Sequence, residues 1–268
     1  MLELTQRLLR AAAGGEPVVL AAVFEPGATA LVAGTRMLVE TSGERMGSLG
    51  DAAIDDLVAG YALEALPRHA AETVYLAEGG LTERTVPGAT SIYIEVVESK
   101  PVFFIVGAGH IGRSLSKIAA FLDFHVVVVD DREEFANSDN LPEADEILCA
   151  DYEESIDNYP INVNTSIVMV SRGHKQDELA LRRCLGRGAG YIGMIGSKRR
   201  TTTVLAHLAD EGFDPAELAA IRTPIGIDIG AETPEEIAIS IMAEVVMLRR
   251  GASAKPMYHR SGSVVGSP

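Results

Sequence analysis

Cysteine is scarce in this 268-residue chain, and the scarcity excludes two kinds of site. Only Cys149 and Cys184 are present, without the spacing of a metal motif and without the number that a disulfide framework needs. Such cysteines are more often small buried hydrophobic residues than reactive thiols. Cys149 is the better candidate for chemistry, because it ends a predicted strand, whereas Cys184 lies inside a predicted helix.

Long apolar runs are missing as well. No stretch approaches the ~18–20 consecutive apolar residues that a membrane-spanning helix needs. The first residues place charged side chains between leucines, and they lack the basic start, apolar run and cleavage site of a signal peptide. We therefore expect a cytoplasmic protein that makes no contact with a membrane.

Basic residues are fewer than acidic residues in this chain. The chain has 23 Lys and Arg against 38 Asp and Glu, which gives a formal net charge of −15. A protein of this charge lacks the basic surface that nucleic-acid phosphates require, and anionic lipid repels it. We expect no nucleic-acid partner, and any local cluster of Lys and Arg becomes informative.

Several common catalytic motifs are also absent. The sequence has no Tyr-x-x-x-Lys pair of the short-chain reductases, no G-x-S-x-G nucleophile elbow and no H-E-x-x-H zinc helix. This absence favours a binding protein over an enzyme, with an oxidoreductase as the alternative.

The most informative stretch that is present begins at residue 103. Phe103–Val106 predicts a buried strand, and the motif G-A-G-H-I-G and a helix-like apolar pattern follow directly. Gly107 permits a tight turn, Gly109 lets the backbone approach a phosphate, and Gly112 lets the helix pack on the strand. A second apolar run ends at Asp130, where an acidic side chain can bind a ribose hydroxyl. This order of elements predicts a Rossmann-type nucleotide-binding half.

The patterns predict an α/β protein in which a smaller α+β domain, residues 1–98, precedes a Rossmann-type parallel-sheet domain, residues 99–251. In the first domain a helix over residues 1–13 is followed by β-prone runs, one further helix and two more strands. These are Pro17–Phe24, Thr29–Ala33, Arg36–Thr41, Arg45–Leu49, the helix Asp51–Leu66, Thr73–Leu76 and Ser91–Val97. A flexible tail is expected over residues 252–268, which are rich in Ser and Gly.

In the second domain, strands and helices are expected to alternate along the chain. Strands are expected at Glu146–Ala150, Thr165–Val170 and Tyr191–Ile195, with helices at Lys175–Arg187 and Ser197–Glu211 and a last helix that Thr233 caps. Ligands of parallel sheets bind at the carboxyl ends of the strands, so the loops there should share one rim. The candidate cofactor-binding residues are Gly107, Gly109, His110, Gly112, Asp130, Arg172, His174, Ser197, Lys198, Arg199 and Asp228.

Two of these loops allow more than one interpretation. Cations at the start of a helix, as in Ser197-Lys198-Arg199-Arg200, oppose the macrodipole by ~0.3–1 kcal/mol each, which favours a bound anion; a solvated basic face fits the spacing equally well. Arg172 and His174 could hold a phosphate or a polar heterocycle, although an ordinary strand-to-helix loop explains them better when they are taken alone. Turn formation likewise explains much of the segment around Asp228.

Five segments, in the same order along the chain, resemble segments of a known family. They are Gly107–Gly112, Val129–Asn137, Ser171–His174, Tyr191–Arg199 and Pro224–Glu236. Together they strongly resemble the C-terminal domain of the xanthine dehydrogenase accessory factors, the XdhC/CoxI family, over residues 101 to about 250. The first domain is less similar. Its Gly34–Val39 and Gly47–Gly50 look like the family's G-A-x-M-L-V…G-S-I-G-G-G run, but Phe24–Ala28 stands near the place of the usual G-S-S-P-R.

The resemblance implies an accessory protein that binds the molybdenum cofactor, as molybdopterin or its dinucleotide form. It further implies support for sulfuration of the cofactor and its insertion into a molybdenum hydroxylase of the xanthine or carbon monoxide dehydrogenase type. A homodimer and a cysteine desulfurase partner belong to the same expectation. The alternatives are an NAD(P)-dependent oxidoreductase, with Asp130 on a free ribose hydroxyl and Arg132 leaving NADP open, and a nucleotide-sensing regulatory module.

Overall fold

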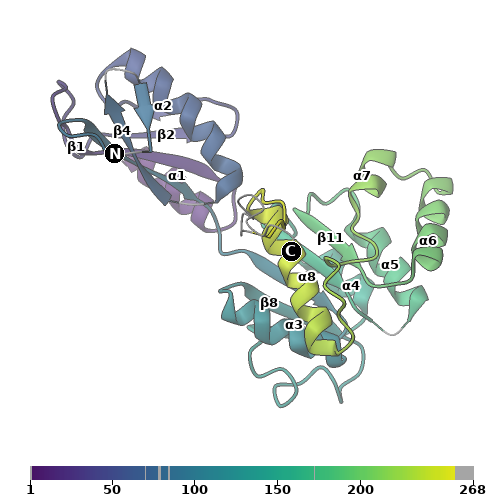
Figure 1. Cartoon of the computed structure of the whole chain (residues 1–268). Helices are drawn as coiled ribbons and strands as arrows, with labels where there is room; N and C mark the ends of the chain where they lie inside the picture. The colour runs from purple at the N-terminus through teal and green to yellow at the C-terminus, as the bar shows by residue number, and fades with distance from the viewer. Residues whose placement is uncertain (1, 70, 78–79, 84, 172, 257–268) are drawn as a thin grey trace, which may run out of the picture.

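The computed structural model describes residues 2–256 except residues 70, 78–79, 84 and 172. Two sheets, each covered by its own helices, lie one after the other along the molecule (Figure 1). We call residues 2–97 the N-terminal unit and residues 102–249 the Rossmann unit. No helix in the described part of the chain is long and apolar enough to cross a membrane.

The N-terminal unit is built on a six-stranded antiparallel sheet of order β3-β2-β1-β6-β4-β5. Helix α2 covers one face through Val58 and Ala62, and α1 covers the other through Leu4 and Ala11. The strands are β1 (Val18–Glu25), β2 (Arg36–Glu40), β3 (Arg45–Gly47), β4 (Ala71–Ala77), β5 (Gly80–Thr82) and β6 (Thr90–Val97). The helices are α1 (Leu2–Ala12), α2 (Ala52–Ala65) and the short η1 (Leu66–Arg68).

The Rossmann unit contains a five-stranded parallel sheet of order β11-β10-β7-β8-β9, which confirms the predicted fold class. Its strands are β7 (Val102–Val106), β8 (His125–Asp130), β9 (Glu146–Cys149), β10 (Thr165–Met169) and β11 (Tyr191–Met194). Its helices are α3 (His110–Phe121), α4 (Tyr152–Asn158), α5 (His174–Cys184), α6 (Lys198–Asp210), α7 (Pro215–Ala220) and α8 (Pro234–Arg249).

Both faces of the parallel sheet are covered, because successive side chains of each strand point to opposite faces. In β7, Phe103 packs with α3 and α8 on one face, and Phe104 packs with α4, α5 and α6 on the other. This two-sided burial explains why the strands read as continuous apolar runs in the sequence.

One predicted strand is wrong. Thr29–Ala33 is a loop, whose Thr29 hydroxyl donates to the carbonyl oxygen of Pro26 at 2.8 Å and lies 2.7 Å from the Thr90 hydroxyl. These contacts hold the loop against β6, and Leu31 inserts into the core of the N-terminal unit. Tertiary contacts therefore override the local β propensity. Strand β5 and helices α4 and α7 are not among the predicted elements.

Helix α8 begins as its sequence predicts. The Thr233 hydroxyl accepts a hydrogen bond from the backbone N–H of Glu236, whose carboxylate accepts one from the backbone N–H of Thr233. The helix ends at Arg249, and Gly251 adopts the left-handed conformation with φ +61°.

A small cluster of polar contacts joins the two units beside the end of α8. Glu98 accepts hydrogen bonds from His69 Nδ1 at 2.9 Å and from the Arg249 guanidinium at 2.8 Å. Arg250 donates to the backbone carbonyls of Arg68 and His69, each at 2.8 Å. Glu98, the first residue after β6, and the end of α8 are thus tied to the N-terminal unit.

Candidate functional site

The carboxyl ends of the parallel strands form one rim, with the glycine loop after β7 near its centre. The backbone N–H of Gly107 donates to the carbonyl of Val129 in β8 at 2.8 Å, and Val170 after β10 donates to Val106 at 2.9 Å. Gly107 has φ +112°, which favours glycine, and a side chain there would lie 2.9 Å from the backbone of Ser171. The loops after β7, β8 and β10 are therefore packed against one another.

The other two glycines of the motif have different surroundings. A side chain at Gly112 would collide with the carbonyl oxygen of Gly107, so glycine is required for α3 to pack on β7. Gly109 precedes α3 with φ −68°, and a side chain there would meet no atom within 4 Å. Protein packing thus gives no reason for glycine at this position. The open space lies at the start of α3, where N–H groups without helical partners can bind an anion.

Asp130 does not present a free carboxylate to the rim. Its side chain is buried, with 0% of its surface exposed, and it accepts hydrogen bonds from the backbone N–H groups of Ala108 and Arg132 and from the Arg132 guanidinium. Burial raises the pKa of Asp130, but the hydrogen bonds from Arg132 and Ala108 outweigh it and lower the pKa below its ordinary value. With its acceptor positions filled by protein donors, Asp130 positions the glycine loop and Arg132. The expected contact with a ribose hydroxyl does not fit this arrangement.

The loop after β10 is held by a buried acid. Asp177, in the first turn of α5, accepts a hydrogen bond from the Ser171 hydroxyl at 2.6 Å. Burial raises the pKa of Asp177 to about 6, while Ser171 and the nearby charge of Arg200 oppose the rise. This carboxylate orients Ser171, and the charge of Arg200, at the start of α6, is close enough to affect its pKa.

The loop after β11 leads directly into α6. Ser197 is the residue before the helix, and its hydroxyl makes no capping hydrogen bond there. Arg199 and Arg200 are exposed and form no ion pair among the described residues. Exposed cations at a helix start oppose the macrodipole, so the geometry retains the unusual charge placement that the sequence indicated.

Three of the predicted site residues lie partly or wholly outside the described residues. Arg172 is outside them. His174 and Lys198 are the first residues of α5 and α6, but their side chains are not described. Their roles stay predictions.

The last two predicted residues have ordinary structural surroundings. His110 begins α3 and is exposed, and its carbonyl accepts a hydrogen bond from the Ser114 hydroxyl at 3.0 Å. Asp228 is exposed and accepts a hydrogen bond from the backbone N–H of Gly230 at 3.3 Å, which closes a turn. Ser240 of α8 holds this loop by donating to the carbonyl of Ile227 at 2.6 Å.

A cavity of about 230 Å³ opens at the rim between the loops that follow β8 and β10. Its lining residues are Asp131, Arg132, Tyr152, Ser171, Gly173 and Gln176. Arg132 faces this space with its guanidinium 4.0 Å from the ring centre of Phe135. Tyr152 and Gln176 were not singled out from the sequence. The position of Tyr152 directly after the cap Asp151, just beyond β9, is the signal that could have indicated it.

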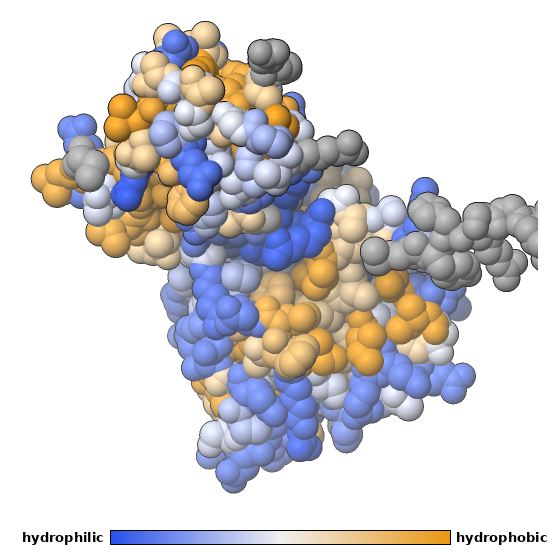
Figure 2. All heavy atoms as spheres, turned by 60° about the vertical axis from the view of Figure 1, so that its left-hand side comes forward, coloured by the Kyte–Doolittle hydropathy of each residue, from blue (hydrophilic) through white to orange (hydrophobic). Residues whose placement is uncertain are grey.

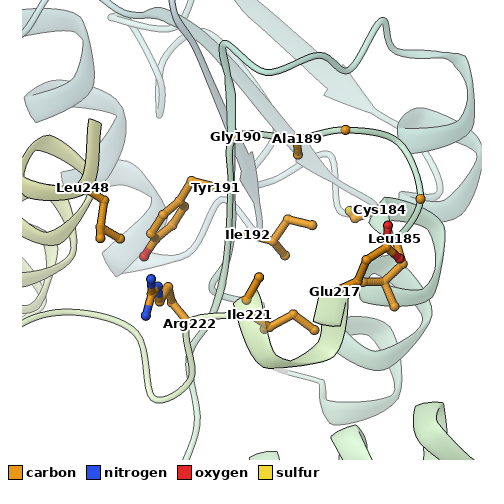
Figure 3. A pocket seen from close by; sticks show the side chains of 13 residues that line it. Cys184, Leu185, Ala189, Gly190, Tyr191, Ile192, Glu217, Ile221, Arg222 and Leu248 are labelled. Atoms are coloured by element: carbon orange, nitrogen blue, oxygen red, sulfur yellow. The ribbon is translucent and has the colours of Figure 1, made fainter. Parts of the chain in front are cut away.

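A second cavity, of about 270 Å³, lies at the amino end of β11, where Tyr191 and Ile192 begin the strand (Figure 3). The side chain of Arg222 extends toward Tyr191 there. No residue of the predicted site lines this cavity. Cys184 forms part of its wall, and burial raises the pKa of its thiol to about 12, so the thiolate is disfavoured. Cys149 is exposed at the end of β9.

Two family models match the chain in succession. A model described as the XdhC and CoxI family matches residues 11–76, and a model described as the XdhC Rossmann domain matches residues 103–245. The second match alone extends over more than half of the chain and includes the whole parallel sheet except Val102, the first residue of β7.

Curated relatives are longer than this chain. YqeB of Escherichia coli K12 is 28% identical over 235 residues, 85% of this chain and 43% of that protein. A probable xanthine dehydrogenase component of Bacillus subtilis 168 is 30% identical over 161 residues, 60% of this chain and 47% of that protein. The molybdenum cofactor insertion chaperone PaoD of E. coli K12 is 28% identical over 89 residues, 33% of this chain and 28% of that protein. The chain thus spans less than half the length of each of these relatives.

A solved structure has a similar fold over nearly the whole chain. It is a Bacillus halodurans protein described as a xanthine dehydrogenase, 20% identical, with a TM-score of 0.55. The match covers 93% of this chain and 96% of that one. At this identity the likeness concerns the fold, in which both units occur together.

Proposed function

The chain belongs to the XdhC and CoxI family, and from this premise we propose that it binds the molybdenum cofactor and delivers it to a molybdenum hydroxylase. The client is of the xanthine or carbon monoxide dehydrogenase type. The observation that carries the proposal is the match of both units to one family, among whose relatives one is named as a molybdenum cofactor insertion chaperone.

The rim fits a ligand that carries phosphate. Gly109 leaves open space at the start of α3, where only a ligand would be obstructed by a side chain. Ser197 and Arg199 stand at the start of a second helix, with a hydroxyl and a charge that the described protein atoms do not use for capping or ion pairing. Two helix starts and a cation can together hold a phosphate or diphosphate group.

When bound, the molybdenum cofactor supplies the oxidation–reduction centre of the client enzyme, and this chain's residues only hold it. The glycine loop and the α6 start would grip the phosphate, and Asp130 would keep the glycine loop in place. We further propose that the chain holds the cofactor while it is sulfurated, with a cysteine desulfurase as the sulfur-supplying partner. In this role the protein is a carrier, and the absence of common catalytic motifs agrees with it.

The nicotinamide alternative is less well supported. An NAD(P)-dependent oxidoreductase would use Asp130 on the ribose, but that carboxylate is buried and bonded to Arg132. Arg132 is itself held by two hydrogen bonds to Asp130, so its guanidinium is only partly free for a ribose phosphate. We therefore rank cofactor delivery first.

The test begins with the natively purified protein. Mass spectrometry should detect molybdopterin or its dinucleotide form among the molecules that copurify with it, and titration with isolated cofactor should saturate one site per chain. NAD(H) and NADP(H) titrated in parallel should bind more weakly. Light scattering should report a homodimer at micromolar concentration, as the resemblance implies. Tight binding of NAD(P) with no binding of molybdopterin would reverse the ranking.

A further inference from the structure

Helix α8 carries apolar residues on two faces. Its inward face packs Ala238, Ile241 and Val245 into the core beneath α3. Its outward residues include Ile239, 53% exposed, and Val246, 37% exposed, spaced two helical turns apart. A helix that is apolar on opposite faces is normally covered on both. Among the described residues nothing covers the outward face.

The neighbouring helix α3 extends this apolar surface. Phe121 ends α3 with 87% of its surface exposed, and Leu122 follows with 40% exposed. Leu122 and Val246 line one cavity of about 360 Å³ between the ends of the two helices, close to the contacts that join the units. Figure 2 shows apolar surface gathered on the Rossmann unit below the hydrophilic band where the units meet. We call Phe121, Leu122, Ile239 and Val246 the α3–α8 patch.

The exposed charges before Phe121 on α3 are positive, whereas Glu235 and Glu236, one turn before Ile239 on α8, are exposed and acidic. Arg113 and Lys117 precede Phe121 on α3 at intervals of four residues, which places the three side chains in one row. Both are exposed, and neither forms an ion pair within the described residues. Asp123, which follows Leu122, is paired with Lys100 at 3.0 Å. On its α3 side the patch is therefore bordered by two cations that form no ion pair among the described residues, in a chain of net charge −15.

We propose that the α3–α8 patch is the docking surface for the client molybdenum hydroxylase, which presents an amphipathic helix with an acidic border. This inference rests on the proposed function, since it names the surface through which the cofactor carrier meets its client. The groove between two adjacent helices accepts a third helix through apolar residues spaced three and four apart. Acidic residues of that helix pair with Arg113 and Lys117. Because α3 begins at the glycine loop, a client docked along α3 lies next to the bound cofactor.

Two other occupants are less consistent with these observations. Anionic lipid also favours basic and aromatic residues, but the net charge of −15 opposes adsorption of the whole chain. A second copy of the chain would bury the two unpaired cations of each subunit against a surface whose acidic side chains, Glu235 and Glu236, lie only beyond the Ile239 end of the patch.

The test measures binding of the cofactor-free xanthine dehydrogenase from the source organism to the full chain by biolayer interferometry. Phe121→Asp should weaken binding at least tenfold, and Lys117→Glu should weaken it and flatten its dependence on salt. Phe24→Asp is the matched control, because Phe24 is an exposed aromatic residue, 71% exposed, on the N-terminal unit. Arg36→Glu is the control for charge, since Arg36 is exposed at the start of β2. Both controls should bind as the wild type does.

The outcomes separate the docking surface from the proposed function. Phe121→Asp should bind isolated molybdopterin with unchanged affinity, because Phe121 is the last residue of α3 and the glycine loop lies at the other end of that helix. A wild-type chain that binds cofactor and enzyme, with Phe121→Asp binding the enzyme equally well, overturns the docking surface alone. A wild-type chain that binds neither overturns the proposed function. The docking surface is also overturned if Phe121→Asp dissociates a homodimer in sedimentation, or if it abolishes flotation with phosphatidylserine vesicles.

Discussion

The Glu98 carboxylate lies 2.8 Å from the guanidinium of Arg249, although 151 positions separate the two residues in the chain. Both side chains are largely buried, and His69 donates to the same carboxylate. Burial raises the pKa of Glu98, but the hydrogen bond and charge of His69 and the charge of Arg249 outweigh it and lower the pKa. The carboxylate is therefore charged at neutral pH and links the two units.

Replacing this carboxylate should loosen the junction of the units. Glu98→Gln leaves the Arg249 cation buried without a counter-charge, so we expect a loss of roughly 3 kcal/mol in unfolding free energy, measured with urea. Because the folded-state pKa of Glu98 is lowered, its contribution is present above its ordinary pKa and is lost as pH falls through the folded value. Asp56→Asn, which breaks the exposed pair with Arg45, is the control and should cost less than about 1 kcal/mol. Equal losses would contradict a buried junction.

The two glycines at the start of α3 should respond oppositely to a side chain. Gly109→Val should abolish binding of molybdopterin while costing at most about 1 kcal/mol of stability, because its side chain enters open space and its φ of −68° suits valine. Gly112→Val should lower the melting temperature strongly, because its side chain collides with the Gly107 carbonyl. Calorimetry on both variants and cofactor titration on Gly109→Val provide the measurements. Full affinity in folded Gly109→Val would disprove a ligand site on this loop.

The basic start of α6 should matter to a ligand and not to the fold. Changing Lys198 and Arg199 together to Gln should weaken cofactor binding by several kcal/mol, since charge-assisted hydrogen bonds contribute roughly 1.5–3 kcal/mol each. The ligand-free variant should be as stable as the wild type or slightly more stable, because the unfavourable interaction with the helix dipole is removed. Wild-type affinity should fall as salt rises, with a shallower dependence in the variant. Unchanged affinity for both molybdopterin and NAD(H) would make this segment a solvated surface.

The buried acid behind the rim predicts a pH dependence. The folded-state pKa of Asp177 is about 6, above that of an unfolded aspartate, so the folded chain holds more protons between about pH 4 and pH 6. The contribution of Asp177 to the free energy of unfolding is therefore complete below about pH 4. It is lost as the pH rises to about 6, and the loss is roughly 2–3 kcal/mol. Asp177→Asn keeps an acceptor for Ser171 and should flatten this part of the stability profile. Asp139→Asn, at an exposed carboxylate, should keep the wild-type profile; the same slope in both variants would refute the assignment.

Local spacing in the sequence determined much of the Rossmann unit. A turn, a helix start and a tight helix–strand contact each depend on residues only a few positions apart, so Gly107 and Gly112 could be assigned their structural roles from the motif alone. The capping box at Thr233 and Glu236 is local in the same sense. The shared rim followed from the parallel sheet, which the alternation of strands and helices predicted.

Only the tertiary structure decided which polar groups remain free. Asp130 follows its strand as a ribose-binding acid would, yet the nearby N–H of Ala108 and guanidinium of Arg132 fill its acceptor positions. The Thr29–Ala33 segment has strand-forming residues, but its contact with Thr90, far along the chain, makes it a loop. The apolar outward face of α8 was likewise hidden among its core residues. Hydrogen bonding and burial depend on neighbours that are distant in the sequence. A local sequence pattern does not show which of these residues the fold places in contact.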